Sequence, residues 1–136
     1  MNDPAVNLLI RLIRGDQRWK TEVSGESWPA LLELSDAAGV GGLVAHEALS
    51  GGVDPPADVR DKLTRRLQSD FRHHGFHFVE AERIASLFEA RGIEFVVLKG
   101  VALARTAYDN PVCRSFRDLD ILVEPGATNA SIAVLE

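Results

Sequence analysis

The chain has 136 residues, which is enough for one ordinary domain with a hydrophobic core and too few for two of typical size. A hydrophobic fraction of 46% and a charged fraction of 26% are typical of a soluble globular protein, and the net charge of −5 disfavours a broad nucleic-acid-binding surface. The one cysteine cannot form an intramolecular disulfide, and arginines interrupt the early apolar residues that a signal peptide or membrane span would need. We therefore expect a cytoplasmic protein without a membrane segment.

The first ninety residues are predicted to be nearly all helix. Asp3-Pro4 is a typical helix start, and one face of the first helix is predicted from the apolar residues Val6, Leu9, Ile10 and Ile13. Further helices are expected after Ser27 and near residues 43–49. From residue 57, apolar residues recur at helical spacing up to Gly92, with Gly75 as a candidate break.

At Ile93 the periodicity changes from helix to strand. Ile93 and residues 95–98 form a compact apolar run with two valines, which is typical of a buried strand, and residues 101–108 return to a helical composition. Residues 119–123 supply a second predicted buried strand, and residues 127–136 begin another helix.

Two aspartates at the start of the second predicted strand are candidate metal ligands. Side chains alternate along a strand, so Asp118 and Asp120 would point the same way, with Cα atoms about 6.5 to 7 Å apart. Converging carboxylates repel unless a cation lies between them, and Mg²⁺ prefers such oxygen ligands. The bland alternative, two solvated aspartates at a strand end, is the better interpretation of the short motif taken alone.

The Lys99-Gly100 pair, between the first predicted strand and the following helix, is a candidate phosphate site. A glycine there lets the main chain approach a ligand, and the helix N-terminus presents free N–H groups to an anion. Lys99 would add a positive charge, and Arg114, in the loop before the aspartates, is a further candidate for contacting phosphate oxygens. A plain turn with an exposed lysine is the alternative interpretation.

Two histidines four residues apart form a second candidate metal site. His73 and His77 have a spacing that can bind a transition metal, but no third ligand is evident in the sequence. Neighbouring arginines favour a polar, solvated helix face instead.

Taken together, these residues resemble the uncharacterised nucleotidyltransferase family of the DNA polymerase beta-like superfamily. The resemblance covers most of the chain, and it is carried by Trp28, residues 37–40, Leu98-Lys99-Gly100, Tyr108, Pro111, Arg114, Asp118-Leu119-Asp120 and Leu122-Val123. It implies an α+β fold with a helical N-terminal region (1–74) and a partial nucleotidyltransferase core (75–136), ordered helix-strand-helix-strand-helix with a mixed sheet.

The resemblance also implies chemistry. Asp118 and Asp120 would bind one or two Mg²⁺ ions, and Lys99 and Gly100, with Arg114, would hold a nucleoside triphosphate whose nucleoside monophosphate passes to an acceptor hydroxyl on a small molecule or protein. Two departures stand out. Gly100-Val101 replaces the usual Gly-Ser or Gly-Gly, and the superfamily's third carboxylate is expected on a strand beyond the helix in which this sequence ends.

The sequence therefore leaves two hypotheses. One is a Mg²⁺-dependent nucleotidyltransferase, and the other is a non-catalytic nucleotide-binding or protein-interaction module. An uncovered sheet edge would allow either to oligomerise.

Overall fold

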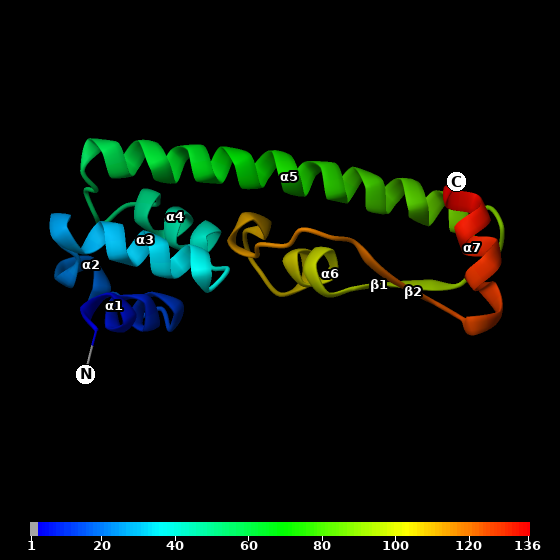
Figure 1. The fold of residues 1–136 in the computed structure, drawn as a ribbon, viewed down its shortest axis with the longest axis horizontal. Helices are drawn as coiled ribbons and strands as arrows, with labels where there is room; N and C mark the ends of the chain where they lie inside the picture. The colour runs from blue at the N-terminus through cyan, green and yellow to red at the C-terminus, as the bar shows by residue number, and fades with distance from the viewer. Residues whose placement is uncertain (1–2) are drawn as a thin grey trace. The chain divides into compact units, whose positions relative to one another are not determined.

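In the computed structural model, which describes residues 3–136, a series of helices precedes a small antiparallel sheet, so the predicted α+β class is confirmed (Figure 1). The described chain divides into two units. The first comprises residues 3–71 and 112–115, and the second comprises residues 72–111 and 116–136.

The first unit is built from short helices around two tryptophans. Its core includes Trp19 and Trp28, each 1% exposed, together with Leu31 and Val44. Trp19 begins a short helix of four residues. The helices of this unit are α1 (Pro4–Ile13), α2 (Trp19–Glu22), α3 (Trp28–Ala37) and α4 (Gly41–Leu49), with a 3-10 turn η1 (Gly25–Ser27) before α3.

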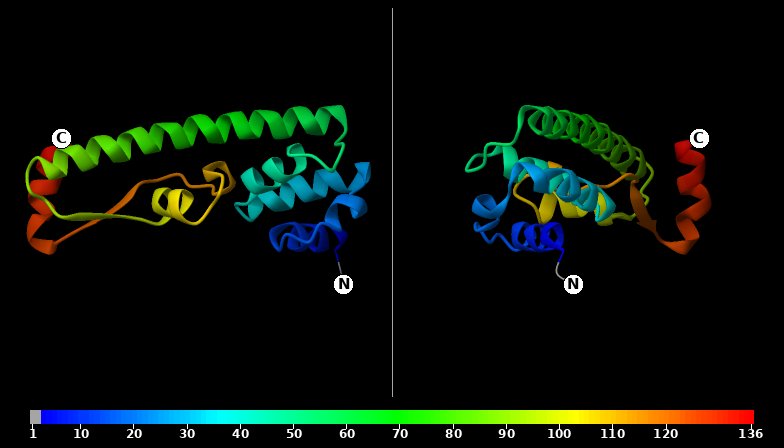
Figure 2. Two further views of the ribbon diagram at one scale, coloured as in Figure 1. Left: turned by 180° about the vertical axis from the view of Figure 1, so that it is seen from behind. Right: turned by 60° about the vertical axis from the view of Figure 1, so that its left-hand side comes forward.

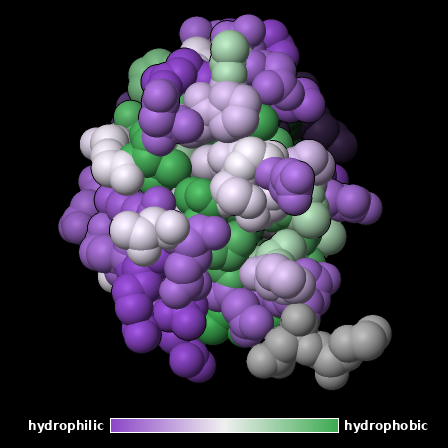
Figure 3. Space-filling model, turned by 90° about the vertical axis from the view of Figure 1, so that its left-hand side faces the viewer, coloured by the Kyte–Doolittle hydropathy of each residue, from purple (hydrophilic) through white to green (hydrophobic). Residues whose placement is uncertain are grey.

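Helix α1 starts as predicted but buries a different face. The Asp3 side chain accepts a hydrogen bond from the Ala5 N–H at 2.9 Å, and Pro4 occupies the first helical position. The buried residues are Ala5, Leu8, Leu9 and Leu12, whereas the predicted face is largely exposed: Val6 by 37%, Ile10 by 41% and Ile13 by 50%. Apolar residues line both stripes, so periodicity alone could not select the one that packs against α3 and α4. Figure 3 shows the α1 and α2 end, where apolar surface is visible between hydrophilic side chains.

Helix α5 (Ala57–Glu89) runs without interruption for 33 residues. Gly75 therefore does not break it, which is consistent with the modest cost of about 1 kcal/mol for a glycine inside a helix. Val59 and Leu63 pack in the first unit, and Ile84 and Phe88 pack in the second.

The second unit places a two-stranded ribbon beside the later part of α5, as Figure 1 and the view from behind in Figure 2 show. Phe95 pairs with Val123 and Leu98 pairs with Asp120, in antiparallel register. Among the described residues the sheet has these two strands and no parallel pair, whereas the resemblance implied a mixed sheet. The elements are β1 (Phe95–Leu98), α6 (Lys99–Thr106), η2 (Pro111–Cys113), β2 (Asp120–Val123), η3 (Pro125–Ala127) and α7 (Thr128–Leu135).

Only one face of this ribbon is buried. Phe95 and Ile121 pack against the core around Phe88, while Val96 and Leu122 are 55% and 57% exposed. The prediction of fully buried strands is therefore wrong for the second face, because α5 and α7 supply apolar partners on one side alone. Within residues 3–136 each strand also keeps one edge unpaired.

Candidate functional site

The register of the ribbon brings the two predicted half-sites together. Leu98 lies opposite Asp120, so the chain that continues into Lys99 emerges beside the start of β2. The Lys99 Nζ lies 3.2 Å from Oδ2 of Asp120, with the lysine side chain 72% and the aspartate side chain 33% exposed. An ion pair this exposed contributes little to stability. It does show that this carboxylate accommodates a cation.

Lys99 has an unusual main-chain conformation. Its φ is 49°, the one positive value among the non-glycine residues described. Left-handed backbone costs an ordinary residue about 1 kcal/mol or more, and residues held this way are frequent at functional sites. The conformation turns the chain from β1 directly into α6 and leaves the lysine side chain in solvent.

Gly100 is needed for packing. A Cβ at this position would lie 2.4 Å from Cβ and 2.8 Å from Cγ of Phe116, which is far inside normal contact distance. The glycine therefore lets the first turn of α6 approach the segment that leads to the aspartates. Among the described residues, no side chain caps α6 by a hydrogen bond, and the approach of its N–H groups to a phosphate stays a prediction.

Asp118 lies just outside the sheet. Strand β2 begins at Asp120, and the exposed Asp118 belongs to the irregular segment before it. Within residues 3–136, no group of three or more histidine, cysteine, aspartate or glutamate residues is arranged to hold a metal ion. Two carboxylates would suffice for Mg²⁺, which commonly takes its other ligands from water and substrate phosphates. The donor set therefore fits that ion.

Arg114 belongs to the first unit, whereas the other predicted site residues belong to the second. Its Nη1 donates a hydrogen bond of 2.6 Å to the main-chain oxygen of Ser115. A phosphate contact by Arg114 stays a prediction. The adjacent Cys113 is buried, and burial raises the pKa of its thiol to about 11, with the Glu47 carboxylate adding to the shift. A raised pKa favours the protonated thiol, which is the less nucleophilic form.

Sequence reasoning missed the role of the histidines. Nε2 of His73 lies 2.9 Å from the carbonyl oxygen of Phe116, and Nε2 of His77 lies 3.2 Å from that of Arg117. His74 is 3% exposed. The predicted solvated histidine face agrees with the exposed His73 and is wrong for the buried His74. The i,i+4 spacing was visible in the sequence, but its partners lie some forty residues away.

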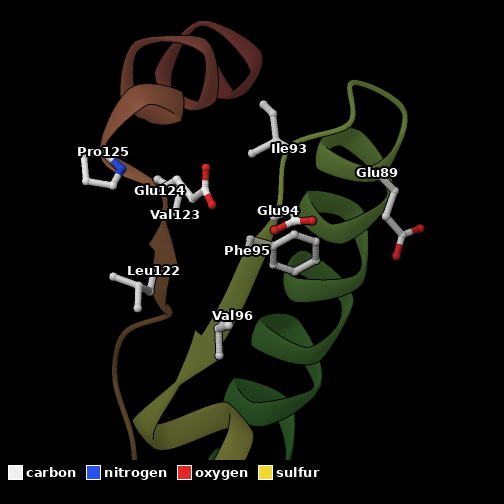
Figure 4. Close-up of a pocket in the computed structure, with 9 residues that line it drawn as sticks. All are labelled: Glu89, Ile93, Glu94, Phe95, Val96, Leu122, Val123, Glu124 and Pro125. Atoms are coloured by element: carbon white, nitrogen blue, oxygen red, sulfur yellow. The ribbon is translucent and has the colours of Figure 1, made fainter.

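A pocket of about 720 Å³ lies at the opposite end of the ribbon (Figure 4). Phe95, Val96 and Leu122 contribute apolar walls, and the three carboxylates around it belong to Glu89, Glu94 and Glu124. Among the described residues, no lysine or arginine lines this pocket. Because like charges repel, this pocket is unsuited to a triphosphate, and the Lys99 and Asp120 end is the better candidate.

Comparison with known proteins supports the family that the motifs suggested. Within residues 3–136, no helix combines the length and apolar character required to cross a membrane. Neither the comparison with curated proteins nor that with solved structures gives a match. A family model described as "Uncharacterised nucleotidyltransferase" matches residues 24–136, a range that contains α3 to α7 and all the predicted site residues. The chain therefore belongs to the uncharacterised nucleotidyltransferase family.

Proposed function

We propose that this protein binds a nucleoside triphosphate with Mg²⁺ and transfers the nucleoside monophosphate to an acceptor hydroxyl. The family supports a nucleotidyltransferase-like function. The observation that carries the finer proposal is the 3.2 Å contact between Lys99 and Asp120, which joins a candidate phosphate-binding turn to a candidate metal-binding strand.

Each residue has a distinct proposed role. Asp118 and Asp120 would hold Mg²⁺, which would supply charge neutralisation for the phosphates. Lys99 is paired with Asp120 now, and we propose that it contacts phosphate oxygens once a metal ion takes its place at the carboxylate. The N–H groups of the first turn of α6 would add neutral donors to the same anion.

The proposed reaction is a displacement at the α-phosphate. The acceptor oxygen forms a bond to the phosphorus, the bond to the leaving pyrophosphate breaks, and the hydroxyl proton leaves to a base not assigned among these residues. The residues described would act by positioning the phosphates and neutralising their charge, which is the main source of catalysis in such transfers.

Thermal unfolding tests the binding proposal. A ligand at 100 times its dissociation constant stabilises the folded state by about 2.7 kcal/mol, so a nucleoside triphosphate should raise the unfolding temperature only when Mg²⁺ is present. Asp118→Asn and Asp120→Asn should each remove the Mg²⁺-dependent part of this rise in unfolding temperature. Asp61→Asn, at an exposed position of α5, is the matched control and should behave as wild type. An equal response in all four proteins would refute the site.

The second candidate function is binding without catalysis. Binding without catalysis is favoured because the candidate site offers two carboxylates, and no group of three acidic, histidine or cysteine ligands is found within residues 3–136. This candidate predicts the same Mg²⁺-dependent stabilisation. A nucleoside triphosphate labelled at the α-phosphate separates the two functions, since a binding module returns the label intact whatever acceptor is supplied.

A further inference from the structure

Two histidines of α5 contact the main chain immediately before Asp118. His73 and His77 approach the carbonyl oxygens of Phe116 and Arg117 at 2.9 Å and 3.2 Å. They are separated from these partners by 43 and 40 residues. These contacts therefore tie the middle of a long helix to the segment that enters β2. We call His73 and His77 the histidine pair.

The chemistry of the contacts defines their direction. A carbonyl oxygen only accepts, so each imidazole must carry its proton on Nε2 and donate it to the carbonyl. The two Nε2 atoms lie 3.1 Å apart, and the rings meet edge to face with centroids 4.4 Å apart. With both Nε2 protons donated to carbonyl oxygens, neither Nε2 can accept, so the 3.1 Å contact between the rings is not a hydrogen bond in this pair of tautomers.

The side chain of Phe116 is held as well as its carbonyl. The ring of the buried His74 stacks on that of Phe116, with centroids 4.3 Å apart and planes 8° apart. Gly100 of α6 packs against the Phe116 Cβ so closely that a side chain at position 100 would not fit. The residue two positions before Asp118 is thus fixed through both its main chain and its side chain.

The segment that carries Asp118 needs such support. Residues 114–119 lie outside any helix or strand, and β2 begins only at Asp120. In this segment, the carbonyl groups of Phe116 and Arg117 accept hydrogen bonds from histidine side chains of α5, whereas strand residues bond to a neighbouring strand. Groups that hydrogen-bond a metal ligand directly commonly affect metal affinity 10- to 100-fold, and we take this range as the scale for groups that hold the residues just before the ligand.

We infer that His73 and His77 are positioning residues for the metal-binding carboxylates, acting through the carbonyl groups of Phe116 and Arg117. This inference rests on the proposed function, because it concerns the affinity of Asp118 and Asp120 for Mg²⁺. This role requires no contact between the histidine pair and the metal or the nucleotide.

The test compares donors with non-donors at the same positions. The double variant His73→Leu with His77→Leu removes both N–H groups, while His73→Gln with His77→Gln keeps a donor of similar reach. Thr64→Leu with Gln68→Leu repeats the i,i+4 change at exposed positions of the same helix and is the matched control. The measurement is the Mg²⁺ concentration that gives half of the nucleotide-dependent rise in unfolding temperature.

The leucine pair should raise this Mg²⁺ midpoint about 10- to 100-fold, the glutamine pair should stay within about threefold of wild type, and the control should not change. A purely structural role would lower the unfolding temperature without ligand and leave the midpoint alone, which would overturn the inference. If the leucine pair does not fold, the single variant His77→Leu keeps the His73 contact and should give a smaller shift in the same direction.

Amide hydrogen exchange gives an answer that does not depend on nucleotide. Exchange over residues 116–120 should rise in the leucine pair and return toward wild type in the glutamine pair. Unchanged exchange would overturn the inference even if metal binding is altered. Failure of the proposed function would look different, because wild type and every variant would lack a Mg²⁺-dependent response. A last outcome would also overturn the inference: Zn²⁺ stabilises the wild type but not the glutamine pair. The imidazole rings would then be metal ligands themselves.

Discussion

Replacing Gly100 with alanine tests how tightly α6 is held against the segment before the aspartates. The new Cβ would lie 2.4 Å from the Phe116 Cβ and 2.8 Å from its Cγ, whereas carbon atoms in contact normally lie about 3.5 to 4.0 Å apart. Because the nearest atom is a Cβ, rotation of the phenyl ring cannot relieve the clash. The main chain at Phe116 or the first turn of α6 must move by about 1 Å.

The expected loss of stability follows from two opposing effects. Overpacking of this kind costs about 1–3 kcal/mol, and alanine in place of glycine in a helix recovers up to about 1 kcal/mol. Gly100→Ala should therefore destabilise the protein by about 0–2 kcal/mol. Gly75→Ala is the matched control, because nothing lies within 4 Å of its added Cβ, and it should stabilise the protein by about 0.5–1 kcal/mol.

Urea unfolding of the three proteins measures these differences. With a slope of about 2 kcal/mol per molar urea, the midpoints of the two variants should differ by about 1 M. Gly100→Ala should also need more Mg²⁺ for nucleotide-dependent stabilisation, since the displaced segment leads to Asp118. A Gly100→Ala protein as stable as the Gly75→Ala protein would refute the close packing on which this reasoning depends.

Four further predictions concern Lys99, the two faces of β2 and the Cys113 thiol. Lys99→Gly should keep the free energy of unfolding within about 1 kcal/mol of wild type, because relief of the positive φ offsets the lost ion pair. The stabilisation by nucleotide should fall in this variant. A large loss of stability without nucleotide would show that the lysine is structural. Ile121→Ala, on the covered face of β2, should cost about 1–3 kcal/mol in urea unfolding and Leu122→Ala less than about 1 kcal/mol, and equal costs would contradict the one-sided sheet. The Cys113 thiol should react with a thiol reagent at pH 8 at least about 100-fold more slowly in the folded than in the urea-unfolded chain, since its pKa is about 11 instead of 9.0. The same shift should weaken the folded state as pH rises from 9.0 toward 11, because only the unfolded thiol ionises there, and stability that is flat across that interval in wild type would contradict it.

Local features of the chain were predictable because their causes are local. Neighbouring residues account for the Asp3-Pro4 cap of α1 and for the change from helix to strand after Gly92. They also account for the placement of the Lys-Gly turn after the first strand and of the aspartates at the start of the second. The family followed from the order of short motifs along the chain, and the match over residues 24–136 confirms it.

Long-range packing decided the rest. Periodicity offered α1 two apolar stripes, and only the position of α3 and α4 selected the one that is buried. Likewise, nothing near His73 in the sequence indicates that its partner is the carbonyl of Phe116, 43 residues later. The sequence by itself identified the candidate residues for binding a metal ion and phosphate. The tertiary structure alone brought Lys99 to Asp120 and the histidine pair to the segment before Asp118, because contacts between distant residues arise from the packing of whole elements.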